Sequence, residues 1–324
     1  MGMKICHFRE HGYTRLGILI EDEEIIDVQK VWSKFYQKEG YYSYDQRAQL
    51  NAPSSLSDVL KIYQENSIDF FKETQEKFKL IFEQGDIDYT PIINTSLLKP
   101  LDQINCYRDF YIHEKHVKKG FEKRNEPVPS PWYEMPVYYK GATSGFIGPK
   151  QNIPWPSYTD KLDYELELGA VIMRDGFNIK EEKALNHVFG YTVFNDISAR
   201  DIQKKEMAVR LGPSKGKDFC SVIGPVIVTA DEFNGAEPNL KMKAYINDEL
   251  WSEGMSGDGQ FTWAQMIAHA SHDEWLITTD FLGSGTVGTG CGLELDKWIK
   301  PDDIIRLEIE KIGTLENTVG HKRI

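Results

Sequence analysis

The sequence predicts an α+β protein that is mostly β, with a small N-terminal α+β domain followed by a larger, β-rich domain. Beyond residue 104 the chain consists mainly of short apolar runs separated by glycine turns and aromatic-rich loops, and helical periodicity is rare. A stretch flanked by prolines, residues 90–100, separates this region from the first hundred residues. We therefore predict domains at 1–100 and 101–324. We expect the second to be a rolled or sandwiched mixed sheet rather than a doubly wound one.

The first domain is expected to begin with strands and to end with one long helix. Residues 4–8, 16–20 and 24–28 are short strand candidates that form a meander between turn residues. Ser67 is a candidate N-cap for a helix that continues to Gln84, with apolar side chains at helical spacing and Gly85 as the stop signal.

The second domain is expected to contain many strands and few helices. The strand candidates are residues 162–171, 190–194, 220–229, 240–246 and 304–309. The helix candidates are residues 109–119, 198–206 and 262–269. Residues 127–136 contain four prolines, which excludes a helix interior and predicts an extended loop or lid.

Composition and charge exclude several classes of protein. The chain of 324 residues is 40% hydrophobic and 27% charged, as in ordinary globular proteins. Its formal net charge of −12 argues against nucleic acid or an anionic membrane as a partner. No apolar run approaches the length of a membrane span, and we expect no secretory signal. The four cysteines have no C-x-x-C spacing, which suits a reducing compartment, so we expect a cytoplasmic protein.

A glycine-rich segment near the C-terminus, GSGTVGTGCGLEL, matches the G-x-G-x-x-G pattern of dinucleotide-binding proteins over residues 283–288. That fingerprint requires a helix directly after the glycines and a βαβ unit around it. Here the alternating residues 291–295 favour a strand, and little chain remains beyond them. We therefore interpret the segment as a tight backbone turn rather than a nicotinamide-cofactor site.

Carboxylates from three segments predict a metal site. Glu165 and Glu167 are two residues apart in a strand and project from the same face. Asp196 follows another strand, and Asp109 is expected to open a helix. Oxygen ligands alone select Mg²⁺, Ca²⁺ or Mn²⁺ over zinc. The alternative is that the glutamates lie on a half-exposed strand and that Asp196 only caps a helix.

Histidines offer a rival metal site. Asp109, His113 and His116 have the spacing of one helix face and suggest zinc, as does the pair His269 and His272. Such pairs are common by chance, and neither set contains an H-E-x-x-H motif.

Four motifs in order resemble those of the fumarylacetoacetate hydrolase family. They are D-F-Y-x-x-x-x-H at 109–116, Y-E-L-E at 164–167, N-D-x-S-A-R-D-I-Q at 195–203 and the C-terminal GSGT…LE. The resemblance implies a mixed β-roll catalytic domain of fumarylacetoacetase type and a homodimer. It also implies the metal ligands Asp109, Glu165, Glu167 and Asp196, with Mg²⁺ expected first and Ca²⁺ or Mn²⁺ as alternatives.

The same resemblance implies the catalytic residues and the reaction. His116 is the expected general base and Glu294 its orienting partner, and the implied substrate contacts are Tyr111, Arg124, Tyr139, Gln203, Lys217 and Thr286. The glycine-rich turn is expected to bring Thr286 and backbone amides against an anionic group of the substrate. The implied enzyme is a metal-dependent hydrolase that cleaves a C–C bond in a 1,3-diketo acid, fumarylacetoacetate or an acylpyruvate, as in aromatic amino acid catabolism.

Other functions remain open at this point. The family also contains decarboxylases, tautomerases, isomerases and dehydratases, so a decarboxylase, tautomerase or isomerase of a 2-oxo acid at the same metal site is the first alternative. A metal-binding sensor without catalysis is a further alternative, although a binder has no need of a base. A nicotinamide-dependent oxidoreductase is the least favoured.

Overall fold

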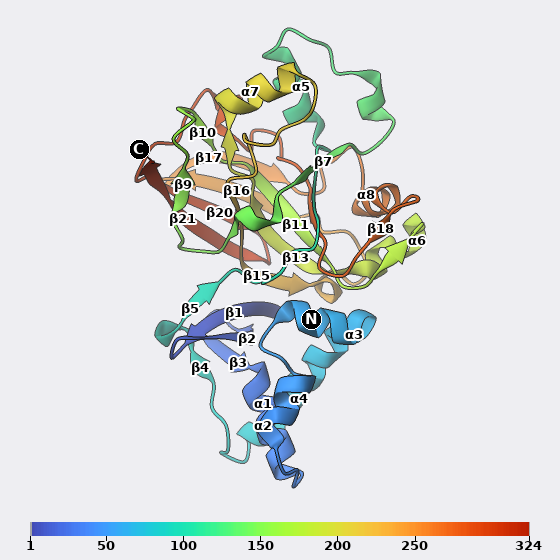
Figure 1. Ribbon diagram of the computed structural model, residues 1–324, viewed down its shortest axis with the longest axis vertical. Coiled ribbons are helices and arrows are strands. Elements are labelled where there is room, and N and C mark those ends of the chain that lie inside the picture. Colours follow the sequence, from blue (N-terminus) through green and yellow to red (C-terminus); the bar gives the residue numbers. More distant parts are fainter. Residues whose placement is uncertain (1, 324) are drawn as a thin grey trace.

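The computed structural model describes residues 2–323, with the N-terminal part at one end of an elongated molecule (Figure 1). A mixed sheet of twelve strands runs β4-β3-β2-β1-β15-β13-β11-β19-β6-β7, with β5 paired to β1 and β8 to β15. Its strands are β1 (Lys4–Glu10), β2 (Tyr13–Ile20), β3 (Glu24–Asp27), β4 (Thr90–Pro91), β5 (Ser96–Leu98), β6 (Tyr107–Phe110), β7 (Tyr138–Gly141), β8 (Phe146–Ile147), β11 (Leu166–Ile172), β13 (Val188–Asn195), β15 (Ser221–Thr229) and β19 (Phe281–Gly283).

A second, five-stranded sheet has the order β17-β16-β20-β21-β9, and two small ribbons pair β10 with β14 and β12 with β18. The five strands are β9 (Ile153–Trp155), β16 (Lys241–Ile246), β17 (Glu249–Met255), β20 (Ile304–Ile309) and β21 (Gly313–Lys322). The ribbon strands are β10 (Leu162–Asp163), β12 (Gly176–Phe177), β14 (Ser198–Ala199) and β18 (Trp275–Leu276).

The helices lie mainly around the edges of the sheets and in the N-terminal part. They are α1 (Val28–Lys38), α2 (Tyr44–Asn51), α3 (Leu56–Tyr63), α4 (Ser67–Phe82), α5 (Glu114–Glu122), α6 (Glu181–Ala184), α7 (Arg200–Ala208), α8 (Trp263–Ala270) and α9 (Gly292–Leu295). Short 3-10 turns are η1 (Gln64–Asn66), η2 (Ile92–Asn94), η3 (Ser130–Tyr133), η4 (Thr143–Gly145), η5 (Leu185–His187) and η6 (Ala230–Phe233). The mixed, mostly sheet structure confirms the predicted fold class.

The large sheet is buried on both faces, as alternation along β15 illustrates. Val222 and Val226 belong to the core that the large sheet shares with the five-stranded sheet. Ile223 and Ile227 belong to the opposite core, together with apolar residues of β1, β2 and the N-terminal helices. Because side chains alternate between the two faces, one strand supplies both cores.

The N-terminal part is joined to the rest through the large sheet itself. Strand β1 pairs with β15 in antiparallel register, Lys4 opposite Val228, and Phe71 of α4 packs on Phe189 of β13 with ring centroids 5.8 Å apart. Figure 1 shows β1 directly below β15 at this junction. The division into domains 1–100 and 101–324 stays a prediction.

Three local predictions were wrong. Residues 109–119 do not form one helix: Asp109 lies in β6, between β19 and β7, and α5 begins only at Glu114. All four residues of β6 are buried, and its aromatic residues Tyr107 and Phe110 favour a strand. The helix predicted at 198 begins at Arg200, after β14. Residues 291–295 form a short helix, α9, rather than a strand, because the amides of Gly292 and Leu293 donate to the Asp163 carboxylate.

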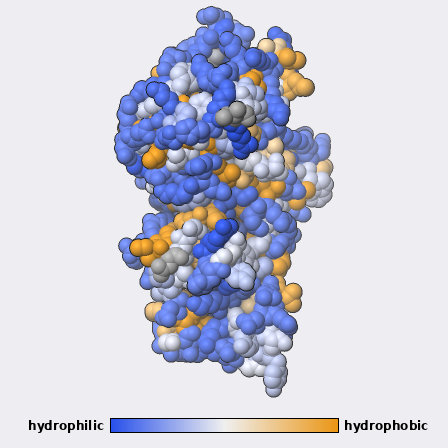
Figure 2. Space-filling model, turned by 60° about the vertical axis from the view of Figure 1, so that its left-hand side comes forward, coloured by the Kyte–Doolittle hydropathy of each residue, from blue (hydrophilic) through white to orange (hydrophobic). Residues whose placement is uncertain are grey.

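The surface agrees with the acidic composition. Figure 2 shows one face covered mainly by hydrophilic residues, with smaller hydrophobic patches, some of them near the waist between the two parts. Among the described residues, no helix combines the length and the apolarity that crossing a membrane requires.

Candidate active site

Three strands of the large sheet bring carboxylates to one buried place. Glu167 lies on β11, Asp109 on β6 and Asp196 directly after β13. Strand β19 runs between β11 and β6, and its Gly283 stands opposite Asp109 in the register. A Cβ at Gly283 would lie 2.4 Å from Asp109 Oδ1, so only glycine leaves room for this carboxylate.

The three carboxylates form a compact oxygen cluster. One oxygen from each of Asp109, Glu167 and Asp196 lies within 4.8 Å of the others, and all three side chains are buried. Within residues 2–323, Asp109 Oδ1 and Asp196 Oδ1 have no hydrogen-bond partner. Burial, and then the neighbouring carboxylates, raise the pKa of Asp109 and of Glu167 well above the ordinary values.

This cluster fits a divalent cation. Buried like charges and unpartnered oxygens are costly unless a positive charge lies among them. Carboxylate oxygens alone suit Mg²⁺, Mn²⁺ or Ca²⁺. The residues that would hold the ion are therefore Asp109, Glu167 and Asp196.

Glu165, the fourth predicted ligand, has different partners. Its carboxylate forms an ion pair with Arg200 at 2.7 Å and accepts a hydrogen bond from Lys217 at 2.5 Å. Burial alone would raise the pKa of Glu165, but Arg200 and Lys217 outweigh it and hold the pKa below its usual range. Lys217, predicted to contact substrate, also pairs with Asp196 and so lies between two of the predicted metal ligands.

Arg200 is a residue that the sequence analysis missed as part of the site. It is buried, and besides Glu165 it contacts Asp163 at 2.8 Å and Gln203 at 3.0 Å. Gln203, predicted as a substrate contact, thus bonds to Arg200 in this structure. The signal was present in the N-D-x-S-A-R-D motif, where an arginine follows a buried Asp196 by four residues.

His116 and Glu294 form a hydrogen-bonded pair. His116 on α5 lies with Nδ1 2.9 Å from Glu294 Oε2 on α9, and both side chains are nearly inaccessible. Glu294 also accepts from the Thr289 amide at 3.1 Å and from Cys291 Sγ at 3.4 Å. Burial opposes ionisation, but the hydrogen bond from His116 and the other donors hold the pKa of Glu294 below its usual value.

The glycine-rich turn contacts the Glu167 carboxylate. The amide of Gly285 donates to Glu167 Oε2 at 2.9 Å, and Thr286 Oγ1 donates to Glu167 Oε1 at 3.3 Å. Gly285 has φ +81°, and a Cβ there would lie 2.4 Å from the Phe110 carbonyl oxygen. The turn therefore positions a carboxylate of the protein, and its contact with an anionic group of the substrate stays a prediction.

The remaining predicted substrate contacts divide into two groups. Tyr139 donates to Asp196 Oδ2 at 2.7 Å, and the Tyr111 ring lies edge-on to His116 with centroids 5.3 Å apart. Arg124 is 48% exposed, lies 3.3 Å from Glu126 and stacks on Phe121.

The rival zinc sites are not assembled. Asp109 lies on a strand and His113 immediately precedes α5, so these two do not share a helix face with His116. His272 is 72% exposed, and neither it nor His269 belongs to a group of three metal-ligating side chains in the described part of the chain.

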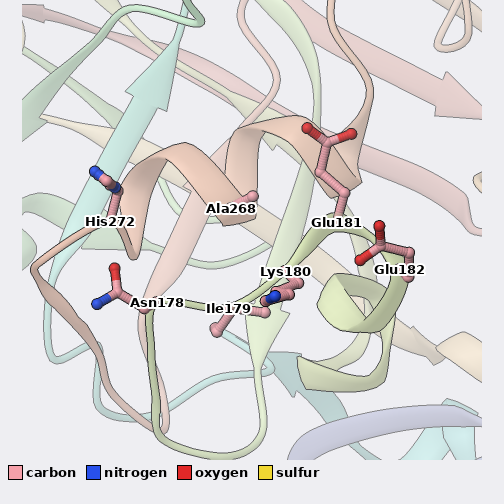
Figure 3. Close-up of a pocket in the computed structure, with 7 residues that line it drawn as sticks. All are labelled: Asn178, Ile179, Lys180, Glu181, Glu182, Ala268 and His272. Atoms are coloured by element: carbon pink, nitrogen blue, oxygen red, sulfur yellow. The ribbon is translucent and has the colours of Figure 1, made fainter.

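A surface hollow of about 320 Å³ lies apart from the carboxylate cluster, between α6 and α8 (Figure 3). Figure 3 shows Glu181 and Glu182 at one end and His272 with Asn178 at the other. None of the predicted site residues lines it. The chemistry is therefore expected at the buried carboxylates and not in this hollow.

Two oxaloacetate tautomerases are similar to this chain in sequence. The YisK oxaloacetate tautomerase of Bacillus subtilis is 28% identical over 318 residues, which cover 95% of this chain and 97% of YisK. The mitochondrial oxaloacetate tautomerase fahd2 of Xenopus laevis is 33% identical over 227 residues, 70% of this chain and 69% of fahd2.

Among solved structures, maleylpyruvate hydrolase from Sphingobium sp. SYK-6, in complex with manganese(II) ion and pyruvate, shares the fold. The TM-score between the two structures is 0.70 and their sequences are 20% identical. The superposition covers 99% of this chain and all of the maleylpyruvate hydrolase chain. A family model for the C-terminal part of fumarylacetoacetate (FAA) hydrolase matches residues 105–320, about two thirds of the sequence. The chain therefore belongs to the fumarylacetoacetate hydrolase family.

Proposed function

We propose that this chain is a divalent-metal-dependent enzyme that moves a proton between the keto and enol forms of a small 2-oxo acid such as oxaloacetate. The observation that carries the proposal is the His116–Glu294 pair, which occurs together with a buried carboxylate cluster. The two sites are connected, because Cys291 pairs with Glu165 in an isolated β-bridge and α9 follows Cys291 directly. Two relatives that align with most of this chain are named as oxaloacetate tautomerases.

His116 has the arrangement of a proton-transfer base. The Glu294 carboxylate lies 2.9 Å from Nδ1 of His116 and can only accept a hydrogen bond from it. The tautomer with its proton on Nδ1 is therefore favoured, and Nε2 is left free to take a proton. Once Nε2 is protonated, the Glu294 carboxylate stabilises the imidazolium. His116 can therefore remove a proton from the carbon beside a ketone and return it to the enol.

The carboxylate cluster supplies the other half of the chemistry. When bound by Asp109, Glu167 and Asp196, a divalent cation acts as a Lewis acid that polarises the substrate carbonyl. We propose Mg²⁺ as the native ion. Mn²⁺ and Ca²⁺ are alternatives, because they also prefer oxygen ligands. The aromatic side chains of Tyr107 and Phe194 are buried, and their ring centroids lie 5.7 Å apart.

A second candidate is hydrolysis of a C–C bond in a 1,3-diketo acid, which the sequence analysis favoured. The same histidine, oriented by a carboxylate, can deprotonate water instead of carbon. Decarboxylation or isomerisation of a 2-oxo acid would use the same metal site and is a further candidate reaction. The homodimer and a role in aromatic amino acid catabolism are proposals that rest on the family, and the cytoplasmic location is a proposal that rests on the spacing of the cysteines.

Parallel assays distinguish these reactions. The decay of enol-oxaloacetate and the cleavage of acylpyruvates are followed by absorbance, with Mg²⁺ and with a chelator. We expect enol decay to accelerate only with metal and no acylpyruvate to be cleaved. Metal-dependent cleavage with release of two fragments, without an effect on enol decay, would assign the hydrolase instead.

A further inference from the structure

A second group of metal-ligating side chains lies at the His116–Glu294 pair. His116 Nδ1, Cys291 Sγ and Glu294 Oε2 lie within 4.8 Å of one another. The separations are 2.9 Å between nitrogen and carboxylate oxygen, 3.4 Å between sulfur and oxygen, and 3.9 Å between sulfur and nitrogen. No oxygen of the carboxylate cluster belongs to this group.

These separations match those around one tetrahedral zinc ion. With Zn–N and Zn–O near 2.1 Å and Zn–S near 2.3 Å, neighbouring ligand atoms lie about 3.3–3.6 Å apart. The three separations here are each within about half an ångström of that range. Imidazole, thiolate and carboxylate suit zinc, whereas Mg²⁺ prefers oxygen ligands alone.

We propose that His116, Cys291 and Glu294 form an inhibitory Zn²⁺ site, distinct from the carboxylate site for the catalytic cation. The structure supplies three protein ligands, and the fourth position is left to water. Such a donor set binds zinc and related transition metals and discriminates against Mg²⁺.

Inhibition follows from the tautomer that the ion imposes. In the metal-free pair we assign a proton to Nδ1, which lies 2.9 Å from Glu294 Oε2, and the Cys291 thiol donates its proton to the same oxygen. Zinc replaces both: the thiol loses its proton to solvent, and the imidazole exchanges its Nδ1 proton for one on Nε2. One proton is released in total, and Nε2, the atom required as the base, is occupied.

Co²⁺ provides a test that does not depend on the reaction. The carboxylate site is first saturated with Mg²⁺, and Co²⁺ is then added while the absorption spectrum is recorded. We expect the intense thiolate-to-cobalt charge-transfer band and tetrahedral cobalt bands, saturating at one cobalt per chain. Cobalt at the oxygen-only carboxylate site would lack the charge-transfer band.

Three variants make the test specific. Cys291→Ser, which changes only sulfur to oxygen, should lose the charge-transfer band, and His116→Gln should weaken cobalt binding. Cys6→Ala is the matched control, because Cys6 is equally buried but lies on β1 and contacts neither His116 nor Glu294. Retained Mg²⁺ binding and an unchanged far-UV circular dichroism spectrum verify that each variant is folded.

Inhibition gives a second readout, which rests on the proposed function, whereas the cobalt spectrum does not. Zn²⁺ added to the Mg²⁺-loaded enzyme should abolish activity, and any activity that Cys291→Ser retains should require at least tenfold more zinc for the same inhibition. A charge-transfer band that is absent from the wild type, or that persists in Cys291→Ser, would overturn the zinc site even if the enzyme proved to be a tautomerase.

Discussion

At the scale of single residues, the buried carboxylates determine how the protein responds to metal. Asp109 and Glu167 are close together, buried and, in part, without hydrogen-bond partners among the described residues. Burial first, and then repulsion between the carboxylates, raises their pKa values, and a bound cation would offset both effects. Metal binding should therefore stabilise the fold as well as support the reaction.

Glu167→Gln tests this link between metal and stability. For the wild type, Mg²⁺ at about a hundred times its Kd should add about 2.7 kcal/mol to the free energy of unfolding. The variant removes one charged ligand of nearly the same shape, so this gain should largely disappear. Thermal melts with Mg²⁺ and with a chelator measure it, and an equal gain in both proteins would contradict the assignment of Glu167 as a ligand.

His116→Gln separates the base from the metal site. The side chain lies on α5 and contacts none of the three clustered carboxylates by hydrogen bond. We expect Mg²⁺ binding to be preserved and kcat to fall by a factor of about 10² to 10⁴, the usual contribution of a positioned base. Calorimetric titration measures the affinity for Mg²⁺, and steady-state kinetics measure kcat. Full activity in this variant would remove His116 from the mechanism.

At the scale of elements, the turn between β19 and α9 connects the two halves of the site. Gly283 and Gly285 approach β6 so closely that a Cβ at either position would collide with Asp109 or Phe110. Beyond the turn, α9 carries Glu294 to His116. The glycine pattern is thus a consequence of close backbone packing around the carboxylates rather than of phosphate binding.

Gly285→Ala measures the requirement for close packing, and Gly235→Ala is its control. Both glycines have positive φ, +81° and +77°, so both variants carry about 1 kcal/mol of backbone strain. Only at Gly285 does the new methyl group meet another atom, the Phe110 carbonyl oxygen. Chemical denaturation should show that Gly285→Ala loses about 1–3 kcal/mol more than the control, together with weaker Mg²⁺ binding. Equal losses would mean that the turn is not tightly packed.

At the scale of the whole molecule, His7 joins the N-terminal helices to the sheet. Its ring on β1 lies 3.2 Å from the Lys99 carbonyl oxygen, and its Nε2 accepts from the Leu56 amide of α3 at 3.2 Å. Accepting that bond requires the neutral ring. Burial accordingly lowers the pKa of His7 below its usual value.

The stability of the protein should therefore depend on His7 at acidic pH. The unfolded chain binds a proton near pH 6.5 and the folded chain only at lower pH, so stability is complete above about pH 6.5 and decreases as the pH falls below it. His7→Gln should cost about 1–3 kcal/mol at pH 8 and reduce the slope between pH 6.5 and 5. The exposed His272, replaced by glutamine, is the control. An unchanged slope in His7→Gln would contradict this role.

Much of the fold follows from local pattern, and the exceptions have physical causes. The alternating runs at 240–246 and 304–309 became β16 and β20, because one face of each strand is buried and the other is more exposed. Asp109 was predicted in a helix because polar residues follow it at helical spacing, yet pairing with β19 and β7 decides its conformation. Such long-range pairing is not visible in a local window of sequence.

The candidate site, like the fold, could be predicted from the sequence only in part. Spacing placed Glu165 and Glu167 on one face, and family motifs suggested His116 with Glu294. Neither indicated that Arg200 and Lys217 would surround Glu165, since these contacts join segments far apart in the chain. The thiol of Cys291 beside Glu294 was equally invisible, because it depends on how α9 begins.

The central claim is metal-dependent proton transfer by His116, and solvent exchange at carbon tests it most directly. Oxaloacetate in D₂O is followed by NMR for the exchange of the protons beside its ketone, above the rate without enzyme. Exchange that requires Mg²⁺ and is lost in His116→Gln, while that variant still binds Mg²⁺, is the predicted result. Exchange that continues with a chelator present, or at an undiminished rate in His116→Gln, would contradict the account.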